Sequence, residues 1–254
     1  MMKLNSKVRA FFGYLLALLI LFVGWHVSSL ILNSPALPTP IETIPVFIHQ
    51  LSSLAPHFVI SAYRVVISIL IGMVLAVPIA LLLSRNEKTD AIFAPFLFLS
   101  YPIPKVVLLP VLLVIFGLGN LPKIMLISLT VFFQVLMSMR DAALQVNPSY
   151  IASVQSLGAN SWEIYRHVIV PAVMPNLFAT LRIASGTAIA ILFIAESMAG
   201  TTGLGYVIIN AWGLIDYPQM FAAIIAMAML GVLIYEIIAS IERKITAWTK
   251  AGQA

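Results

Sequence analysis

Residues able to do covalent or metal chemistry are few in this chain and lie far apart in the sequence. There is no cysteine, which excludes disulfides, thiolate nucleophiles and Cys-ligated metals. An intramembrane serine protease would need a histidine after Ser185, but all four histidines precede it. A membrane zinc protease needs a His-Glu-x-x-His pair, which the sequence lacks, and Asp90, Asp141 and Asp216 are too scattered to share a magnesium ion. The sequence therefore argues against an enzyme and predicts no cofactor and no bound metal.

The chain also lacks its own means of using ATP. A phosphate-binding loop reads G-x-x-x-x-G-K-[ST], and no glycine here is followed by lysine. A transporter driven by ATP would need its ATPase on a separate polypeptide. The alternative is an ion-gradient-driven secondary transporter or channel, which usually carries an acidic residue near the membrane midplane. Glu196 and Glu236 instead fall near the ends of apolar stretches, where we expect boundary positions or helix–helix contacts.

One lysine falls well inside an apolar stretch. Lys105 follows Tyr101-Pro-Ile-Pro104, and closely spaced prolines break the hydrogen-bond ladder of a helix. Such breaks are tolerated in membranes where they line a cavity, and a lysine there must face protein or water. Our hypothesis is that Tyr101, Pro102, Pro104 and Lys105 border a translocation path in which Lys105 attracts an anion. The alternative is that the span begins later and that Lys105 lies at a polar interface.

The elements that would position these residues are apolar helices. The 254 residues are 61% hydrophobic and only 9% charged, whereas soluble domains are about 25% charged. The apolar runs are continuous, unlike the alternating strands of a membrane barrel, and each is close to the roughly 20 residues that a spanning helix needs. The sequence therefore predicts an all-α membrane protein with six transmembrane helices. They cover approximately residues 11–32, 62–83, 92–116, 123–139, 177–198 and 220–241.

The positions of the 14 Lys and Arg residues predict the orientation. The loops 33–61, 117–122 and 199–219 contain none, so we place them outside and both termini in the cytoplasm. The net charge of +5 is then a topology signal, and we predict no nucleic-acid partner. The basic residues on the predicted cytoplasmic side are Lys3, Lys7, Arg9, Arg85, Lys88, Arg140, Arg166, Arg243, Lys244 and Lys250.

The simplest organisation is one membrane domain preceded by one extra helix. A cleaved signal peptide is the alternative for the first span, but its apolar run is long and no A-x-A site follows it. We expect residues 35–40 to be extended, residues 46–57 to form a short amphipathic surface helix, and residues 200–205 to form a flexible turn. Gly72 and Ala76, four residues apart, predict close helix packing.

The segment at 147–158 has the signals of a short helix at both ends. Asn147 suits an N-cap and Pro148 the first helical position, while Gly158 suits the left-handed position that ends a helix. A second helix is predicted from Asn160, which has capping-box spacing to Glu163 and should end at the prolines 171 and 175. Ile151, Val154 and Leu157 would form one apolar stripe. Two capped helices indicate either a docking element or an amphipathic pair lying on lipid headgroups.

The same segment resembles the EAA loop of ABC-importer permeases. The family pattern is E-A-A, three residues, Gly, nine residues and I-x-L-P. Here Ala152-Ser-Val-Gln-Ser-Leu-Gly158 is followed by nine residues and Val168-Ile-Val-Pro171, so the glycine and the proline match while Ala152 replaces the glutamate. Further motifs resemble the branch that imports nitrate, aliphatic sulfonates, taurine and related solutes. These motifs are Leu37-Pro-Thr-Pro, Tyr101-Pro-Ile-Pro104 with Leu109-Pro110, Phe116-Gly-Leu-Gly119 and Gly203-Leu-Gly-Tyr206.

The resemblance implies the fold and the partners. It implies the MetI-like transmembrane fold of type I ABC importers, with an extra helix and outer loop at 1–56, the permease domain at 57–242 and a cytoplasmic tail at 243–254. It also implies a homodimer in the lipid bilayer of a bacterial or archaeal plasma membrane, two cytoplasmic ABC ATPase subunits and an extracytoplasmic solute-binding protein. The solute itself is not implied. The residues that would form the ATPase-docking coupling helix are Ile151, Ala152, Ser153, Val154, Gln155, Ser156, Leu157, Gly158 and Ala159, with Pro171 ending the loop.

Overall fold

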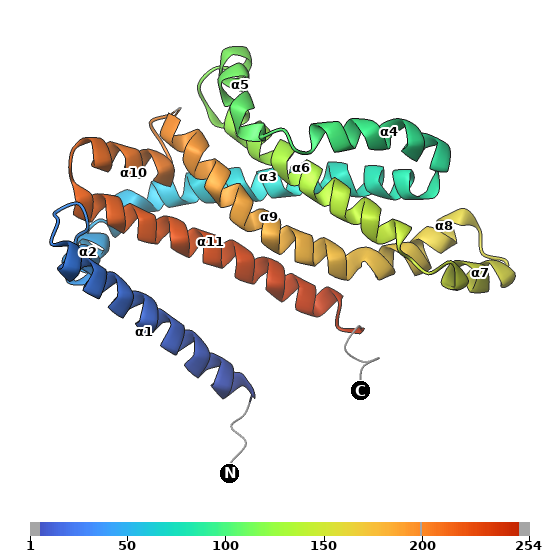
Figure 1. Cartoon of the computed structure of the whole chain (residues 1–254), viewed down its shortest axis with the longest axis horizontal. Helices are drawn as coiled ribbons and strands as arrows, with labels where there is room; N and C mark the ends of the chain where they lie inside the picture. Colours follow the sequence, from blue (N-terminus) through green and yellow to red (C-terminus); the bar gives the residue numbers. More distant parts are fainter. Residues whose placement is uncertain (1–5, 199, 249–254) are drawn as a thin grey trace, which may run out of the picture.

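The structure is a computed structural model that describes residues 6–198 and 200–248, and every regular element within them is a helix (Figure 1). In these labels η1 is a 3₁₀-helix and η2 is a π-helical turn. The elements are α1 (Ser6–Leu32), α2 (Pro40–His49), α3 (Leu51–Arg85), α4 (Glu87–Ser100), η1 (Lys105–Leu108), α5 (Leu109–Phe116), α6 (Asn120–Leu144), α7 (Pro148–Ser156), α8 (Ser161–Ile164), η2 (Tyr165–Ile169), α9 (Val170–Met198), α10 (Leu204–Gly213) and α11 (Tyr217–Ile245).

The six predicted spans are present once the third is taken as a bent pair. In the described residues five helices are long and apolar enough to cross a membrane, and the pair 88–100 and 105–116 forms a sixth span bent by 83°. The helices run past the predicted apolar cores, as α3 does over 35 residues. Hydropathy locates the lipid-facing part of a span, whereas helix ends continue into the interface until a cap stops them.

Helices α3, α6, α9 and α11 pack side by side as the core of the bundle (Figure 1). Gly72 of α3 makes the predicted close approach, since a Cβ there would lie 2.9 Å from Cβ of Val131 on α6. Fully buried alanines continue the contact at Ala76 of α3, Ala188 of α9 and Ala223 of α11. Small residues let helix backbones approach closely, which is how helices associate in a lipid solvent.

Helix α1 diverges from this bundle (Figure 1). It is attached at its C-terminal part, where Trp25 stacks on Phe221 of α11 with ring centroids 5.5 Å apart and donates from Nε1 to the Pro38 carbonyl at 3.0 Å. Ser29 donates to the Leu37 carbonyl at 2.6 Å. From Phe12 to Val23 the apolar side chains of the helix are exposed in the monomer, so lipid or another chain must cover them.

Several local expectations were wrong. Residues 35–40 are not extended, because residues 35–37 form a turn in which Leu37 N donates to Ser34 O at 3.0 Å. The predicted surface helix at 46–57 is divided between α2 and α3, because Thr39 and Glu42 form a capping box that starts α2 at Pro40. The outer segment 199–219 contains α10, which was not predicted. Prolines 171 and 175 do not end the helix that starts after Asn160, because the π-helical turn η2 leads into α9 without a break.

The described ends of α1 and α11 point away from α2, where the two helices meet. The ion pair between Arg182 and Glu242 joins the C-terminal end of α11 to the first half of α9, which follows α7 and α8 in the chain. The two ends and α7 therefore share one side, as the charge pattern requires, and the cytoplasmic identity of that side remains a prediction. Lys3, Lys250 and the tail beyond 248 lie outside the described residues.

Candidate functional site

Helix α7 forms as its end signals predict. The Asn147 side chain accepts from the Ser149 N–H at 2.9 Å, and Pro148 occupies the first turn. Gly158 has φ +87°, the left-handed conformation that residues with a side chain rarely adopt, and it reverses the chain after Leu157. The capping box of α8 is also confirmed, because Asn160 Oδ1 accepts from Glu163 N at 3.0 Å while Glu163 Oε2 accepts from Asn160 N at 2.7 Å.

The apolar residues of this segment do not share one surface. Ile151 is 8% exposed and packs into the chain's own core, whereas Leu157 is 86% exposed. The predicted stripe of Ile151, Val154 and Leu157 is therefore wrong as a single exposed face. The large apolar side chains that do face outward are Tyr150, Leu157 and Trp162. They lie on both sides of the Gly158 turn.

The broken span places Lys105 at a helix end. The helix α4 stops at Ser100, and the ammonium of Lys105 donates to the carbonyls of Ser100 at 2.5 Å and Tyr101 at 3.0 Å. The same Nζ lies 4.3 Å from the ring centroid of Phe133 on α6. Carbonyls freed by the prolines are thus satisfied by a cation, which also suits the negative end of the helix dipole.

A cavity of about 430 Å³ borders this break. The four residues of the hypothesis, Tyr101, Pro102, Pro104 and Lys105, all line it. The opposite wall comes from α6 and α9. Its residues are Thr130, Phe133, Gln134, Ile191 and Ile194, with Ile103 and Val106 completing the lining.

Polar side chains join α6 to α9 along the wall of this cavity and beyond it. Gln134 Nε2 donates to Thr187 Oγ1 at 3.2 Å, and the hydroxyls of Ser138 and Thr180 lie 2.5 Å apart. Thr130, Gln134 and Ser138 are four residues apart and so share one face of α6. This face continues from the cavity towards the end of α6 that precedes α7.

At the other end of the bundle, a buried ion pair joins α3 to α9. Arg64 Nη1 donates to Glu196 Oε1 at 2.6 Å, and the two side chains are 2% and 0% exposed. The guanidinium also donates to Asn120 Oδ1 at 2.9 and 2.8 Å and to Thr202 through its carbonyl and its Oγ1, both at 2.9 Å. Ser61 Oγ donates to the glutamate at 2.8 Å. Buried charges are tolerated when they are paired and fully hydrogen-bonded in this way.

The start of α10 closes over the same glutamate. Gly205 N donates to Glu196 Oε2 at 2.9 Å, and Gly203 N donates to His57 Nδ1 at 3.0 Å. Gly203 has φ +111°, and any Cβ there would collide with the Glu196 carboxylate. Residues 200–205 are therefore a fixed cover over a polar core, and Thr202 contacts the chain's own Arg64.

The family comparison agrees with the helical bundle. The model of the family described as "Binding-protein-dependent transport system inner membrane component" matches residues 68–247. The chain belongs to this family. The permease is thus a multi-pass protein of the bacterial or archaeal plasma membrane and the membrane subunit of an ABC importer, which is a transport subunit and not an enzyme.

Curated relatives match the permease over nearly its whole length. The taurine transport system permease protein TauC of Escherichia coli (strain K12) is 28% identical over 96% of this chain and 91% of its own. The putative aliphatic sulfonates transport permease protein SsuC of Bacillus subtilis (strain 168) is 28% identical over 93% of this chain and 87% of its own.

A solved structure shares the fold. The inward-facing MetNI methionine ABC transporter has a chain with a TM-score of 0.66 and 20% identity, covering 76% of the permease and 96% of that chain. The all-helical permease thus has the predicted MetI-like fold of type I importers. The helix α1 fits the prediction of an additional N-terminal span.

Sequence reasoning missed the Arg64–Glu196 pair in the permease. It placed Glu196 correctly at a helix–helix contact but named no partner for it. A usable signal was present, because an arginine and a glutamate each fall near the outer end of a predicted span, and burial in lipid requires such charges to pair. Their separation by 132 residues hid the relationship.

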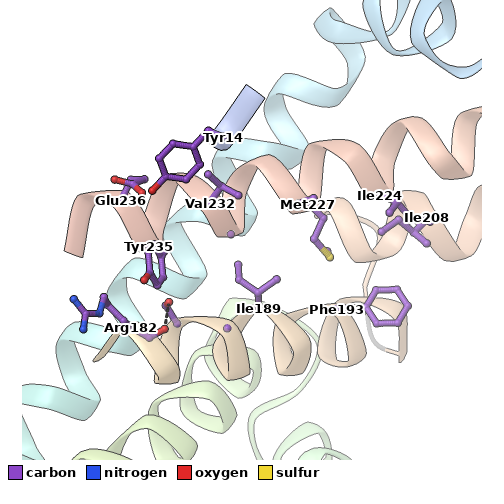
Figure 2. A pocket seen from close by; sticks show the side chains of 14 residues that line it. Tyr14, Arg182, Ile189, Phe193, Ile208, Ile224, Met227, Val232, Tyr235 and Glu236 are labelled. Atoms are coloured by element: carbon purple, nitrogen blue, oxygen red, sulfur yellow. Dashed lines mark hydrogen bonds between the residues drawn. The ribbon is translucent and has the colours of Figure 1, made fainter. Parts of the chain in front are cut away.

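A second and larger cavity of about 820 Å³ lies between α9 and α11, with Tyr14 of α1 at its border (Figure 2). Its interior is apolar, with Ile189, Phe193 and Met227 facing the space, while Arg182 lies towards one end (Figure 2). Arg182 is paired with Glu242. The cavity therefore offers an apolar interior, and its charged border holds a paired arginine together with a second carboxylate, Glu236.

Proposed function

We propose that this permease forms the translocation path of an ATP-driven importer for a small, anionic solute, such as a sulfonate, taurine or nitrate. Cytoplasmic ATPase subunits on separate chains supply the energy, and an extracytoplasmic binding protein delivers the solute. Two copies of the permease form the path between them. The family match and the printed names of the relatives support this proposal.

The observation that carries the proposal is the geometry of α7, Gly158 and α8. An exposed Leu157 precedes a left-handed turn, and the helix that follows runs without interruption from Ser161 to Met198. An apolar side chain that projects from a capped helix suits a groove on a partner protein. A movement of the partner would then be transmitted directly into α9. In this proposal residues 151–159 form the docking segment, with Ile151 buried in the chain's own core and Leu157 in contact with the partner.

Capture of the ATPase tests this proposal. The purified permease should retain its candidate ATPase, and adding the binding protein should raise ATP hydrolysis. Gly158→Pro should abolish capture, because proline requires φ near −65° and lacks the N–H that Gly158 donates to Gln155 O at 2.9 Å. Gly117→Pro is the matched control, since Gly117 also has positive φ and also ends a helix, but in the loop predicted to face outside.

The outcomes separate the alternatives. If the wild-type permease captures no ATPase, the proposal fails. Uptake into vesicles driven by an ion gradient, with no ATPase present, would establish a secondary transporter instead. Equal loss of capture in Gly158→Pro and Gly117→Pro would show that α7 has no special part in docking.

The broken span is proposed to border the path. Its cavity lies where two prolines and Lys105 interrupt the third span, and non-helical backbone in a membrane is tolerated only against protein or water. Uptake by the assembled transporter should fall in Lys105→Ala and Lys105→Met. Unchanged uptake in both variants would remove Lys105 from the path.

A further inference from the structure

We propose that the cavity at the broken span is a solute-selective site of the permease itself, which binds small solutes carrying a compact anionic group and a second, hydrogen-bonding group. This inference rests on the proposed import function and adds a selection step inside the membrane. After the binding protein has selected a solute, the permease would then select again by the charge of that solute.

The first step is the charge of Lys105. The residue is 9% exposed, and among the residues that the structure describes no carboxylate forms an ion pair with it. The buried arginines differ, because Arg64 is paired with Glu196 and Arg140 with Asp90. A buried charge without a counter-charge is unfavourable, so an anion entering the cavity gains the interaction that the protein does not supply.

The second step is the hydrogen-bonding capacity left at the ammonium. A lysine has three N–H donors, and the carbonyls of Ser100 and Tyr101 accept two of them. These two bonds and the Phe133 ring hold Nζ in a fixed position at the cavity wall. The third donor can bind an anionic oxygen without reorganisation of the lysine.

The third step is the amide of Gln134. Its Nε2 binds Thr187, but its Oε1 is buried and has no partner. Exchanging the amide N and O would only move the vacancy to the nitrogen. A buried amide atom without a hydrogen-bond partner is unfavourable. A solute with an ammonium, amine or hydroxyl group beside its anionic group satisfies Gln134 and Lys105 together.

Size and surroundings favour this cavity over the larger one. About 430 Å³ is at the small end of ligand pockets, which span roughly 300–1,000 Å³. The 820 Å³ cavity has an apolar interior, an arginine that is paired with Glu242, and a lining carboxylate at Glu236, so it does not favour an anion. The two cavities therefore provide a matched pair for a test of charge preference.

The natural absence of cysteine makes the test direct. Thr130→Cys puts one thiol in the wall of the broken-span cavity, and Ile189→Cys puts one in the apolar cavity. Membrane vesicles containing the full chain with its ATPase are treated with the anionic 2-sulfonatoethyl methanethiosulfonate or the cationic 2-(trimethylammonium)ethyl methanethiosulfonate. Each labelling rate is divided by the rate of the same reagent with a free thiol.

At position 130 the anionic reagent should react at least about tenfold faster than the cationic one, because a unit charge nearby in a poorly screened site shifts local ion concentration by that factor or more. At position 189 the anionic reagent should have no advantage, because Arg182 is paired and the carboxylate of Glu236 lines that cavity. Adding Lys105→Met to Thr130→Cys should abolish the preference, and adding Lys105→Arg should keep it. Lys88→Met, which removes an exposed lysine of α4, should leave it unchanged.

The inference is overturned by equal rates at position 130, by a preference that survives Lys105→Met, or by a thiol at 130 that neither reagent reaches while Ile189→Cys is labelled. Gln134→Leu should lower uptake of taurine, the probe solute, more than it lowers anionic labelling. Equal loss in both would overturn the part of the inference that concerns Gln134. ATPase capture on the same preparations reports the proposed function separately, so labelling without selectivity in a capture-competent complex defeats the inference alone.

Discussion

Arg64 and Glu196, which are 132 positions apart in the sequence, form a 2.6 Å ion pair that joins α3 to α9 inside the bundle. The polar groups that contact the pair come from three helices. Ser61 lies on α3, Asn120 on α6 and Gly205 on α10. The pair thus connects four helices near one end of the bundle. Its neighbourhood is the most sharply testable part of the fold.

Breaking this pair from one side should be more damaging than removing it. Arg64→Met or Glu196→Gln alone leaves an uncompensated buried group, and we expect each to lower the free energy of unfolding by about 3–5 kcal/mol. The double variant should lose less than the sum of the two. Unfolding of the purified proteins in mixed detergent measures the free energy of unfolding of the two single variants and the double variant. Arg243 lies 3.9 Å from Glu236 in a solvent-exposed pair. Arg243→Ala should therefore change the free energy of unfolding by less than about 1 kcal/mol.

Gly203→Ala should prevent correct closure of the outer segment. Its φ of +111° is strained for alanine, and the new Cβ would occupy the position of the Glu196 carboxylate. We expect a loss of several kcal/mol or failure to accumulate in the membrane. Gly213→Ala is the control, because a Cβ there meets nothing within 4 Å. Similar thermal stability of the two variants would contradict the packing described around Glu196.

The pair at the opposite end of the bundle should depend on arginine geometry. Arg140 Nε and Nη2 each donate to one Asp90 oxygen at 2.6 Å, which joins α6 to the start of α4. Lysine cannot make this two-pronged contact, so Arg140→Lys should lower the free energy of unfolding by about 2 kcal/mol. Hydrogen exchange should speed up at the start of α4. Protection equal to wild type would mean that the pair does not hold α4 to α6.

Substitutions of Leu157 and Ile151 should have opposite effects: one should impair docking and the other stability. Leu157→Ala should weaken ATPase capture at least about tenfold while leaving thermal stability unchanged, because its side chain is 86% exposed. Ile151→Ala should do the reverse and lower the free energy of unfolding by about 2 kcal/mol or more, as expected for a buried isoleucine. If Ile151→Ala removes capture without destabilising the protein, the assignment of the two faces is reversed.

Local signals gave the parts of the site that depend on neighbouring residues. Asn147, Gly158 and the Asn160–Glu163 box act within one helical turn, so their types and spacing suffice to predict α7 and the start of α8. Prolines 102 and 104 likewise indicate a break, and the bend is found there. Each of these features is determined by residues within it or next to it in the sequence.

The remaining features depend on residues that are distant in sequence. The apolar residues Ile151 and Leu157 look equivalent in a helical repeat, and only the position of the bundle decides which is buried. The π-helical turn at 165–169 lets the chain continue past Pro171, which no rule based on proline alone anticipates. Helix α10 is ten residues long, too short for a span, and its order depends on Glu196 accepting from its first turn.

The continuous helix from Ser161 to Met198 has a mechanical consequence. At 1.5 Å per residue it is a rod of about 57 Å, and Glu196 pins it near one extremity while Trp162 stands free near the other. Such a rod behaves as a lever whose fulcrum is the Arg64–Glu196 ion pair. A sideways push at Trp162 would swing Thr187, which lies beside the broken span, through about a quarter of that distance. A large displacement at Trp162 would thus become a small displacement at Thr187, beside the broken span.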